Sequence, residues 1–293
     1  MPNNESAARS PDARRPIKGG SPADSVDRRQ TAVPDNPTDA RFRVLDCLIS
    51  RTSIERAAKS VIEHVDSKTG GYVCFSNVHT VVTARKDIEL RRITNESLLS
   101  VPDGMPLSLI ARWRGLIDVQ RVPGPTFMPY LIERARDLRH YFYGSTPETL
   151  DRLLTALRQQ FPEIAVAGAF SPPFKELSTD EARAVIARIQ ASRPDVIWVG
   201  LGAPKQEKWM ARYWEHLRPA VLLGVGAAFD MQAAVVPRAP KWMQCTSLEW
   251  LYRLGREPRR LARRYLVTNS LFLYYLFADA TRRLSEIAAT RGR

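Results

Sequence analysis

A repeated alternation of short apolar runs with amphipathic stretches constrains the fold of this chain more than any other feature. Five runs of strand length are largely apolar: Tyr72–Ser76, Arg139–Tyr143, Ile164–Ala167, Val196–Val199 and Val221–Leu223. Segments between them carry apolar residues at helical spacing: Pro147–Phe161, Thr179–Ala191 and Lys205–Leu217. Apolar strands that alternate with helices predict a parallel sheet covered on both faces. The expected fold class is therefore α/β, with a Rossmann-like sheet.

The N-terminal part of the chain departs from this pattern. Residues 1–40 mix Pro, Ser, Asp, Asn and Arg and contain no apolar signal-peptide core, so we expect a disordered tail there. The apolar run Phe42–Ile49 predicts a first strand, and Ser53–Ala58 opens a helix with a capping-type start. The α/β domain is expected to span 41–246.

Positive charge is the strongest compositional signal. Lys and Arg number 44 against 31 Asp and Glu, which gives a formal net charge of +13. Such an excess indicates a polyanionic partner, which could be nucleic acid, anionic lipid headgroups or a phosphorylated ligand. Arginines are frequent in 247–293, where no strand pattern occurs, so we expect a basic helical appendage. Its apolar run Leu271–Phe277 is too short to span a bilayer.

The three cysteines indicate a reducing environment. Cys47, Cys74 and Cys245 are far apart and form no CxxC pair. Cys47 and Cys74 lie in apolar stretches, which predicts buried thiols rather than metal ligands or disulfides. A cytoplasmic location follows.

Glycine-rich segments follow two of the predicted strands, at the sheet edge where ligands bind in such folds. Gly200–Pro204 and Gly224–Gly226 would let a ligand approach the backbone closely. Gln206, in the first turn of the next helix, could hydrogen-bond a base or sugar, and Asp230 is either a helix cap or a ligand-binding carboxylate. The first segment lacks the third glycine of a dinucleotide fingerprint, which disfavours a nicotinamide-dependent oxidoreductase.

One carboxylate and a group of arginines carry the strongest chemical signals. Asp103 lies in a Pro-Asp-Gly turn after a helical segment that ends near Leu99, where a carboxylate could take a proton from a sugar hydroxyl. An ordinary Asp-Gly turn is the alternative. Arg253, Arg260 and Arg263 could clamp a diphosphate, or they could form a solvated basic face. No Asp-x-Asp metal motif occurs in the core.

Over about residues 42 to 265, the order and spacing of these motifs resemble the WecG/TagA/CpsF glycosyltransferases. The motifs are Pro102-Asp103-Gly104, Arg121-x-x-Gly124, Gly200-Leu201-Gly202-x-Pro204-Lys205-Gln206-Glu207, Gly224-Val225-Gly226-x-x-Phe229-Asp230, Arg238-Ala239-Pro240 and Glu249-Trp250-Leu251-x-Arg253. The resemblance implies an inverting, metal-independent transferase without a cofactor. Such an enzyme moves a sugar from a UDP-sugar to a lipid-linked acceptor in surface or exopolysaccharide synthesis.

The resemblance also assigns roles to residues. By analogy, Asp103 looks like the general base, and Asn77, Arg121 and Gln206 look like substrate-binding residues. The C-terminal arginines, Arg253, Arg260 and Arg263 among them, would offset charge on the departing UDP. The donors of the family include N-acetylmannosamine, its uronic acid, glucose and glucuronic acid.

The partners that follow are a UDP-sugar, a polyprenyl-diphosphate-linked glycan and an anionic membrane surface. The membrane would hold the protein peripherally at the inner face of the cell membrane, and a homo-oligomer is possible.

The main alternative is a basic nucleic-acid-binding protein without enzymatic activity. It explains the net charge of +13 but not the glycine segments, and no zinc finger, RNP or helix-turn-helix signature occurs. A catalytically inactive assembly scaffold is a further alternative, which the presence of Asp103 disfavours.

Overall fold

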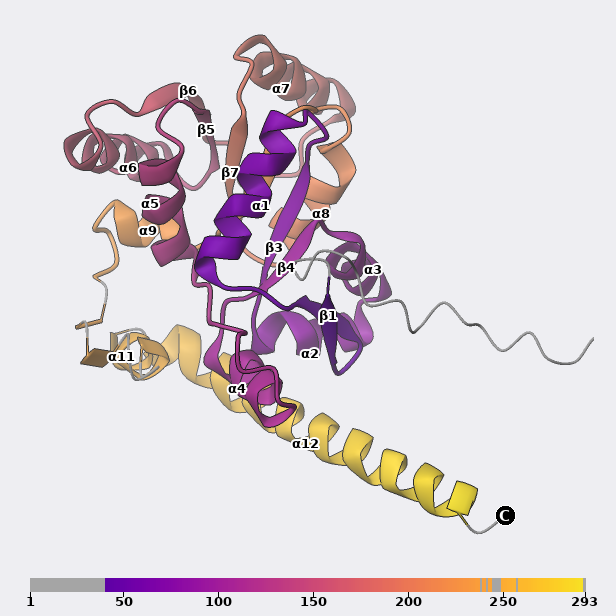
Figure 1. Cartoon of the computed structure of the whole chain (residues 1–293). Helices are drawn as coiled ribbons and strands as arrows, with labels where there is room; N and C mark the ends of the chain where they lie inside the picture. Colours follow the sequence, from indigo (N-terminus) through magenta and orange to yellow (C-terminus); the bar gives the residue numbers. More distant parts are fainter. Residues whose placement is uncertain (1–39, 238, 241, 244–248, 257, 292–293) are drawn as a thin grey trace, which may run out of the picture. The chain divides into compact units, whose positions relative to one another are not determined.

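The computed structural model describes residues 40–237, 239–240, 242–243, 249–256 and 258–291, drawn in colour in Figure 1. Apart from Ala40, the predicted tail at 1–40 lies outside the described residues, as do Arg238 and Cys245. The described part of the chain belongs to one compact unit of contacts, Asp35–Arg293.

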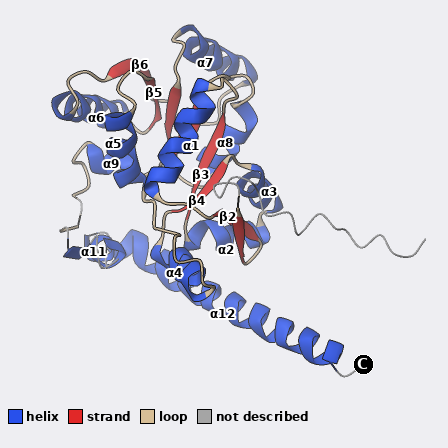
Figure 2. Ribbon diagram, in the orientation of Figure 1, coloured by secondary structure: helices blue, strands red, loops and turns tan. Residues whose placement is uncertain are grey.

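A six-stranded sheet forms the centre of this unit (Figure 2), with strand order β4-β3-β8-β7-β5-β6. All its neighbouring strands run parallel. The strands are β3 (Gly71–Ser76), β4 (Leu99–Pro102), β5 (Arg139–Gly144), β6 (Ala165–Phe170), β7 (Val196–Gly200) and β8 (Val221–Gly224). Five of them were predicted from apolar runs, and the parallel sheet confirms the expected α/β fold.

Helices cover both faces of the sheet, as predicted. One face packs against α1 (Ile54–Asp66), α5 (Gly124–Arg134), α6 (Pro147–Gln160) and α9 (Ala228–Gln232). The other packs against α3 (Ile88–Glu96), α7 (Thr179–Ala191) and α8 (Lys205–Tyr213). Successive residues of β7 show why its run is apolar throughout. Trp198 packs into the core cluster on the face covered by α1, whereas Ile197 and Val199 pack into the core cluster on the face covered by α8.

Two sequence predictions about strands were wrong. The run Phe42–Ile49 is not one strand but the hairpin β1 (Arg41–Val44) and β2 (Cys47–Ser50), which pairs antiparallel in a sheet of its own. The turn is hidden in the sequence because Leu45, with φ of 52°, adopts a left-handed conformation that leucine rarely takes. The residues before Asp103 form strand β4 rather than the end of a helix, since α3 already ends at Glu96.

A third core cluster joins the hairpin to the C-terminal helix. It contains residues of β1 and β2, α2 (Val78–Lys86), α4 (Met105–Trp113) and α12 (Pro258–Arg291). Helix α11 (Glu249–Arg256) precedes α12 in the chain. Phe272 of α12 is buried in this cluster, and Arg85 of α2 donates two hydrogen bonds to Asp279 at 3.0 Å. The predicted helical appendage is therefore present, and its apolar run is half core: Leu271, Phe272, Tyr275 and Leu276 pack inward.

Cys47 and Cys74 are buried, as predicted, and both are free thiols. Burial raises the pKa of the Cys47 thiol to about 12, with a smaller contribution from Asp46. Burial likewise raises the pKa of Cys74 well above its ordinary value. Because thiolates are the reactive form, these thiols act as core residues rather than nucleophiles.

Candidate active site

Asp103 and Asn77 meet where β4 and β3 end. The sheet register pairs Ser76 with Pro102, so the next residue of each strand emerges beside its neighbour. The Asp103 backbone N–H donates to the Ser76 carbonyl at 2.8 Å, and Asn77 Nδ2 donates to Asp103 Oδ2 at 3.4 Å. Asn77 also caps α2, since its Oδ1 accepts from the Thr80 N–H at 3.2 Å. The carboxylate is thus oriented by a neighbour that is itself fixed.

The start of α5 holds the other oxygen of the same carboxylate. The Gly124 backbone N–H donates to Asp103 Oδ1 at 3.3 Å. The partial positive charge at a helix N-terminus attracts an anionic side chain. Arg121 lies three residues before Gly124 and is half-buried, in a loop that Val122 ties to β4 through a 2.8 Å hydrogen bond to the Pro102 carbonyl. The structure therefore brings the loop of Arg121 to the turn of Asp103.

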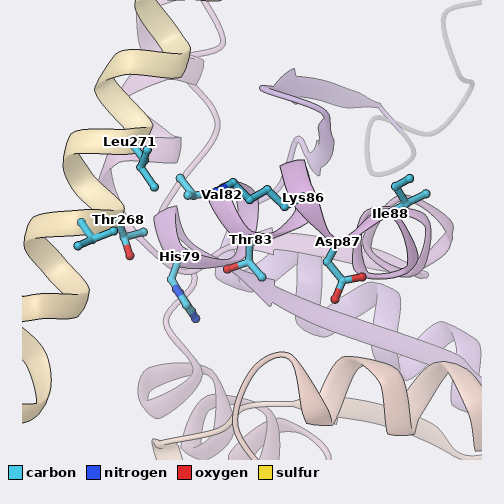
Figure 3. A pocket seen from close by; sticks show the side chains of 9 residues that line it. His79, Val82, Thr83, Lys86, Asp87, Ile88, Thr268 and Leu271 are labelled. Atoms are coloured by element: carbon cyan, nitrogen blue, oxygen red, sulfur yellow. The ribbon is translucent and has the colours of Figure 1, made fainter.

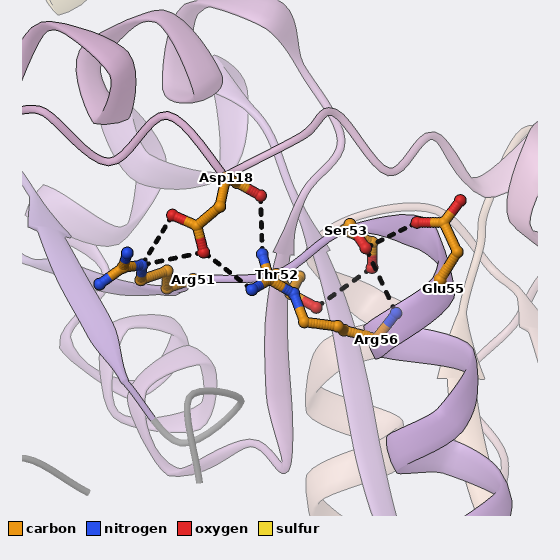
Figure 4. Close-up of polar contacts among 6 residues, drawn as sticks. All are labelled: Arg51, Thr52, Ser53, Glu55, Arg56 and Asp118. Atoms are coloured by element: carbon orange, nitrogen blue, oxygen red, sulfur yellow. Dashed lines mark hydrogen bonds and ion pairs between the residues drawn. The ribbon is translucent and has the colours of Figure 1, made fainter.

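The loop that carries Arg121 is anchored by an ionic cluster that sequence reasoning missed (Figure 4). Asp118 accepts from Arg51 Nε and from Arg56 Nη1, both at 2.8 Å. Burial acts to raise the pKa of the Asp118 carboxyl, but the hydrogen bonds from Arg56 and Arg51 outweigh it and hold that pKa below its ordinary value. These partners are 62 and 67 residues away in sequence, so no local motif could reveal them.

Gln206 joins the two predicted glycine segments. Its Nε2 donates to the Gly224 carbonyl at 2.7 Å, and its Oε1 accepts from the Gly202 N–H at 3.2 Å. The side chain is buried, so it fastens the loop after β7 to the end of β8. The residue predicted to hydrogen-bond a substrate lies at the expected sheet edge, with both polar ends of its amide engaged in the protein.

Glu207, the neighbour of Gln206, is a fully buried carboxyl. Its Oε1 accepts from Gln206 Nε2 at 3.0 Å, whereas its Oε2 has no hydrogen-bond partner among the described residues. Burial raises the pKa of Glu207 above its ordinary value, and the hydrogen bond from Gln206 only partly opposes that shift. The buried position favours the neutral acid, because the charge of an ionised carboxylate would be uncompensated there.

Substituting Glu207 by glutamine should make the protein more stable than the wild type at neutral pH. A carboxyl whose pKa is raised on folding contributes fully to stability below its unfolded pKa, and that contribution is lost as pH rises towards the folded value. The loss begins near the ordinary pKa of 4.5 and grows above it. Thermal unfolding between about pH 5 and pH 8 measures the Tm difference between the two proteins, which should widen with pH.

The same change at the exposed Glu215 is the matched control. The Tm difference between this variant and the wild type should not change with pH. A Tm difference for Glu207→Gln that also stays constant over this range would contradict a buried neutral carboxyl.

The remaining predicted residues lie further along the chain. Asp230 is half-buried inside α9, whose N-cap is Ala227, so the interpretation of Asp230 as a helix cap was wrong. Arg253 lies on α11, and Arg260 and Arg263 lie on α12, but their side chains are outside the part that the structure describes. Among the predicted site residues, hydrogen bonding directly joins Asp103 to Asn77.

A cavity of about 630 Å³ lies beside this site, between α2 and α12 (Figure 3). Its lining mixes apolar and polar side chains: His79, Val82, Thr83, Lys86, Asp87, Ile88, Val267, Thr268 and Leu271. His79 belongs to the same first turn of α2 that Asn77 caps. The cavity therefore extends away from the candidate site along α2 and does not include Asp103.

The chain is similar to glycosyltransferases of one known family. It matches the model of the glycosyl transferase WecG/TagA/CpsF family over residues 42–286. It is 29% identical over 203 residues to the N-acetylglucosaminyldiphosphoundecaprenol N-acetyl-beta-D-mannosaminyltransferase of Bacillus subtilis (strain 168), covering 68% of this chain and 77% of that protein. The enzyme with the same name from Bacillus spizizenii is 28% identical, with the same coverage.

Proposed function

Because the chain belongs to the WecG/TagA/CpsF family of glycosyl transferases, we propose that it transfers a sugar from a UDP-sugar to a glycan carried on a polyprenyl diphosphate. The names of the two Bacillus relatives give the acceptor as N-acetylglucosaminyldiphosphoundecaprenol and the sugar as N-acetylmannosamine. Of the four donor sugars considered from the sequence, these names favour N-acetylmannosamine. The product would serve surface-polysaccharide synthesis.

The orientation of the Asp103 carboxylate supports this proposal most strongly. Asn77 and Gly124 donate to its two oxygens, so the group is directed rather than free to rotate. In the proposed reaction, Asp103 takes the proton of the acceptor hydroxyl as its oxygen bonds to the anomeric carbon. The bond from that carbon to the diphosphate breaks in the same displacement, and UDP leaves. A single displacement inverts the anomeric configuration.

Negative charge that develops on the departing diphosphate needs a positive partner. We assign this role to Arg253, Arg260 and Arg263, because the core sequence contains no Asp-x-Asp motif for a divalent metal. Guanidinium groups bind diphosphate oxygens in bidentate geometry. Arg121, in the loop beside Asp103, is assigned to substrate binding.

Transfer should persist in the presence of EDTA. The arginines, rather than a chelatable cation, are proposed to neutralise the leaving group. An assay of UDP release with and without EDTA measures this directly. Complete loss of activity that Mg²⁺ or Mn²⁺ restores would contradict the metal-independent mechanism.

The outward face of α12 supports a peripheral position at the inner face of the cell membrane. Leu273, Tyr274 and Phe277 are exposed, while neighbouring residues of the same helix pack into the core. An exposed apolar stripe on a helix rich in arginine suits the headgroup region of a bilayer. Among the described helices, none is both long and apolar enough to cross a membrane.

A thermal-shift panel of UDP-sugars tests the donor class. A ligand that binds only the folded protein raises its Tm, so UDP and UDP-N-acetylmannosamine should both stabilise it. Random-sequence DNA belongs in the same panel, because the net charge of +13 and the arginine-rich C-terminal segment favour a nucleic-acid-binding protein. Stabilisation by DNA without any stabilisation by UDP would favour that alternative.

A further inference from the structure

An exposed apolar surface stands at the C-terminal end of α4, outside the candidate active site. Trp113 is 82% exposed, Ile117 is 81% exposed and Leu109 is 39% exposed. Leu109 and Trp113 are four residues apart on one helix and so share a face. These three residues are called the α4 tip below. By contrast, the core tryptophan Trp198 is fully buried.

The α4 tip is exposed while the rest of its helix is firmly held. Leu107, Ile110 and Ala111, on the other side of α4, are buried in the cluster that also contains Phe272 of α12. The helix ends at Trp113, and the following turn is fixed because the Leu116 N–H donates to the Ala111 carbonyl at 3.0 Å. The fold therefore presents the apolar tip from a rigid support.

Positive charge surrounds the α4 tip. Arg112 and Arg114 flank Trp113 in sequence and are both exposed. Arg114 donates a hydrogen bond to the backbone carbonyl of Arg43, which brings a third exposed arginine to this corner. The one carboxylate close by in sequence, Asp118, already pairs with two other arginines. An exposed tryptophan and isoleucine with a basic rim complement an anionic lipid surface, where aromatic rings and guanidinium groups both favour the interface.

We propose that the α4 tip is a second bilayer contact, separate from α12, in which Trp113 and Ile117 enter the headgroup region of an anionic membrane. The position of α4 would link this membrane contact to the candidate active site. The helix begins at Met105, two residues after Asp103, and its nine residues span about 14 Å. A tip seated in the membrane would hold the carboxylate at a short, fixed height above the headgroups, where a sugar on a lipid diphosphate stands. This use of the contact rests on the proposed function, but the contact itself does not.

Vesicle binding by the full-length protein tests the proposal. The double variant Trp113→Ala/Ile117→Ser is compared with the wild type on vesicles of phosphatidylglycerol mixed with phosphatidylcholine. We expect the Kd for these vesicles to rise about tenfold, because two exposed apolar side chains no longer leave water on binding. Transfer to a water-soluble acceptor should be unchanged, whereas transfer to an acceptor embedded in vesicles should fall.

Two further variants sharpen the result. Phe174→Ala removes an aromatic side chain that is 88% exposed, in the loop after β6, the strand at the opposite end of the sheet from β4. This control should bind vesicles as the wild type does. Arg112→Glu keeps the apolar tip but reverses one charge, so it should weaken binding to anionic vesicles and leave binding to pure phosphatidylcholine vesicles unchanged.

Three results would overturn the proposal. The first is wild-type binding to anionic vesicles by both Trp113→Ala/Ile117→Ser and Arg112→Glu. The second is a loss of binding on substituting Leu273 and Phe277 of α12 to serine, with none on substituting the α4 tip. The third is a shift from dimer to monomer in light scattering with vesicle binding unchanged, which would make the tip a contact between two copies of the chain. If wild-type protein shows no transfer at all but the tip variants still lose vesicle binding, the proposed function fails and the membrane contact stands.

Discussion

Asp103→Asn should lower the rate of sugar transfer by about 10² to 10⁴-fold while the protein still binds UDP. Asparagine has nearly the same shape, and its carbonyl oxygen can still accept the Gly124 N–H that reaches Asp103 Oδ1 in the wild type. It cannot take the proton of the acceptor hydroxyl. The measurement is kcat for UDP release with acceptor present, together with the Tm shift that UDP produces.

The companion variant Asn77→Ser separates the base from its support. Serine still caps α2, because it offers an oxygen to the N–H groups of the first turn. It removes the amide that donates to Asp103 Oδ2 at 3.4 Å. We expect a smaller fall in kcat than for Asp103→Asn. A wild-type rate for Asp103→Asn would mean that Asp103 is only a turn residue.

Gly144→Ala should destabilise the protein by about 3 kcal/mol, the largest stability effect that we expect from a single methyl group. Gly144 ends β5 with φ of +128°, a conformation that disfavours a side chain. A Cβ at this position would also lie 2.5 Å from the carbonyl oxygen of Gly200, and this backbone cannot move without disturbing the paired end of β7. Denaturant unfolding gives the change in free energy.

Gly115→Ala is the matched control for that measurement. Gly115 has φ of +79°, but a Cβ there meets no atom within 4 Å. Only the cost of the left-handed backbone remains, which is about 1 kcal/mol. Equal losses for the two variants would show that the close approach of β5 and β7 is not what Gly144 provides. Because the segment after Gly200 carries Gln206, a distorted contact should also impair ligand binding.

Much of the fold was predictable because buried parallel strands are apolar along their whole length. The run around Trp198 is apolar at every position, since its side chains alternate between two core clusters. The helix Thr179–Ala191 was predicted with the bounds it has, and Ser178 and Glu181 form a capping box at its start. The hairpin at Leu45 and the short strand β4 were missed. The hairpin was missed because its turn depends on the left-handed conformation of Leu45. Strand β4 was missed because it is short and its pairing partner, β3, lies elsewhere in the chain.

The candidate site was predictable in position more than in detail. Strands β4, β3, β8 and β7 are neighbours, so the segments that carry Asp103, Asn77, Asp230 and Gln206 follow four adjacent strands at one edge. That arrangement follows from the sheet. The tie that Gln206 makes between two loops, and the pair of arginines that hold Asp118, were beyond sequence reasoning. Such contacts join residues that only the folded chain brings together.

The most direct test of the account is the mass of the product. The full-length protein is incubated in EDTA with UDP-N-acetylmannosamine and N-acetylglucosamine linked through a diphosphate to a short prenyl chain, and the lipid is analysed by mass spectrometry. We predict an acceptor that gains the mass of one N-acetylhexosamine residue, with one UDP released for each product and almost no product from Asp103→Asn. An acceptor whose mass stays unchanged with this donor and with the UDP-linked N-acetylmannosaminuronic acid, glucose and glucuronic acid would contradict the account.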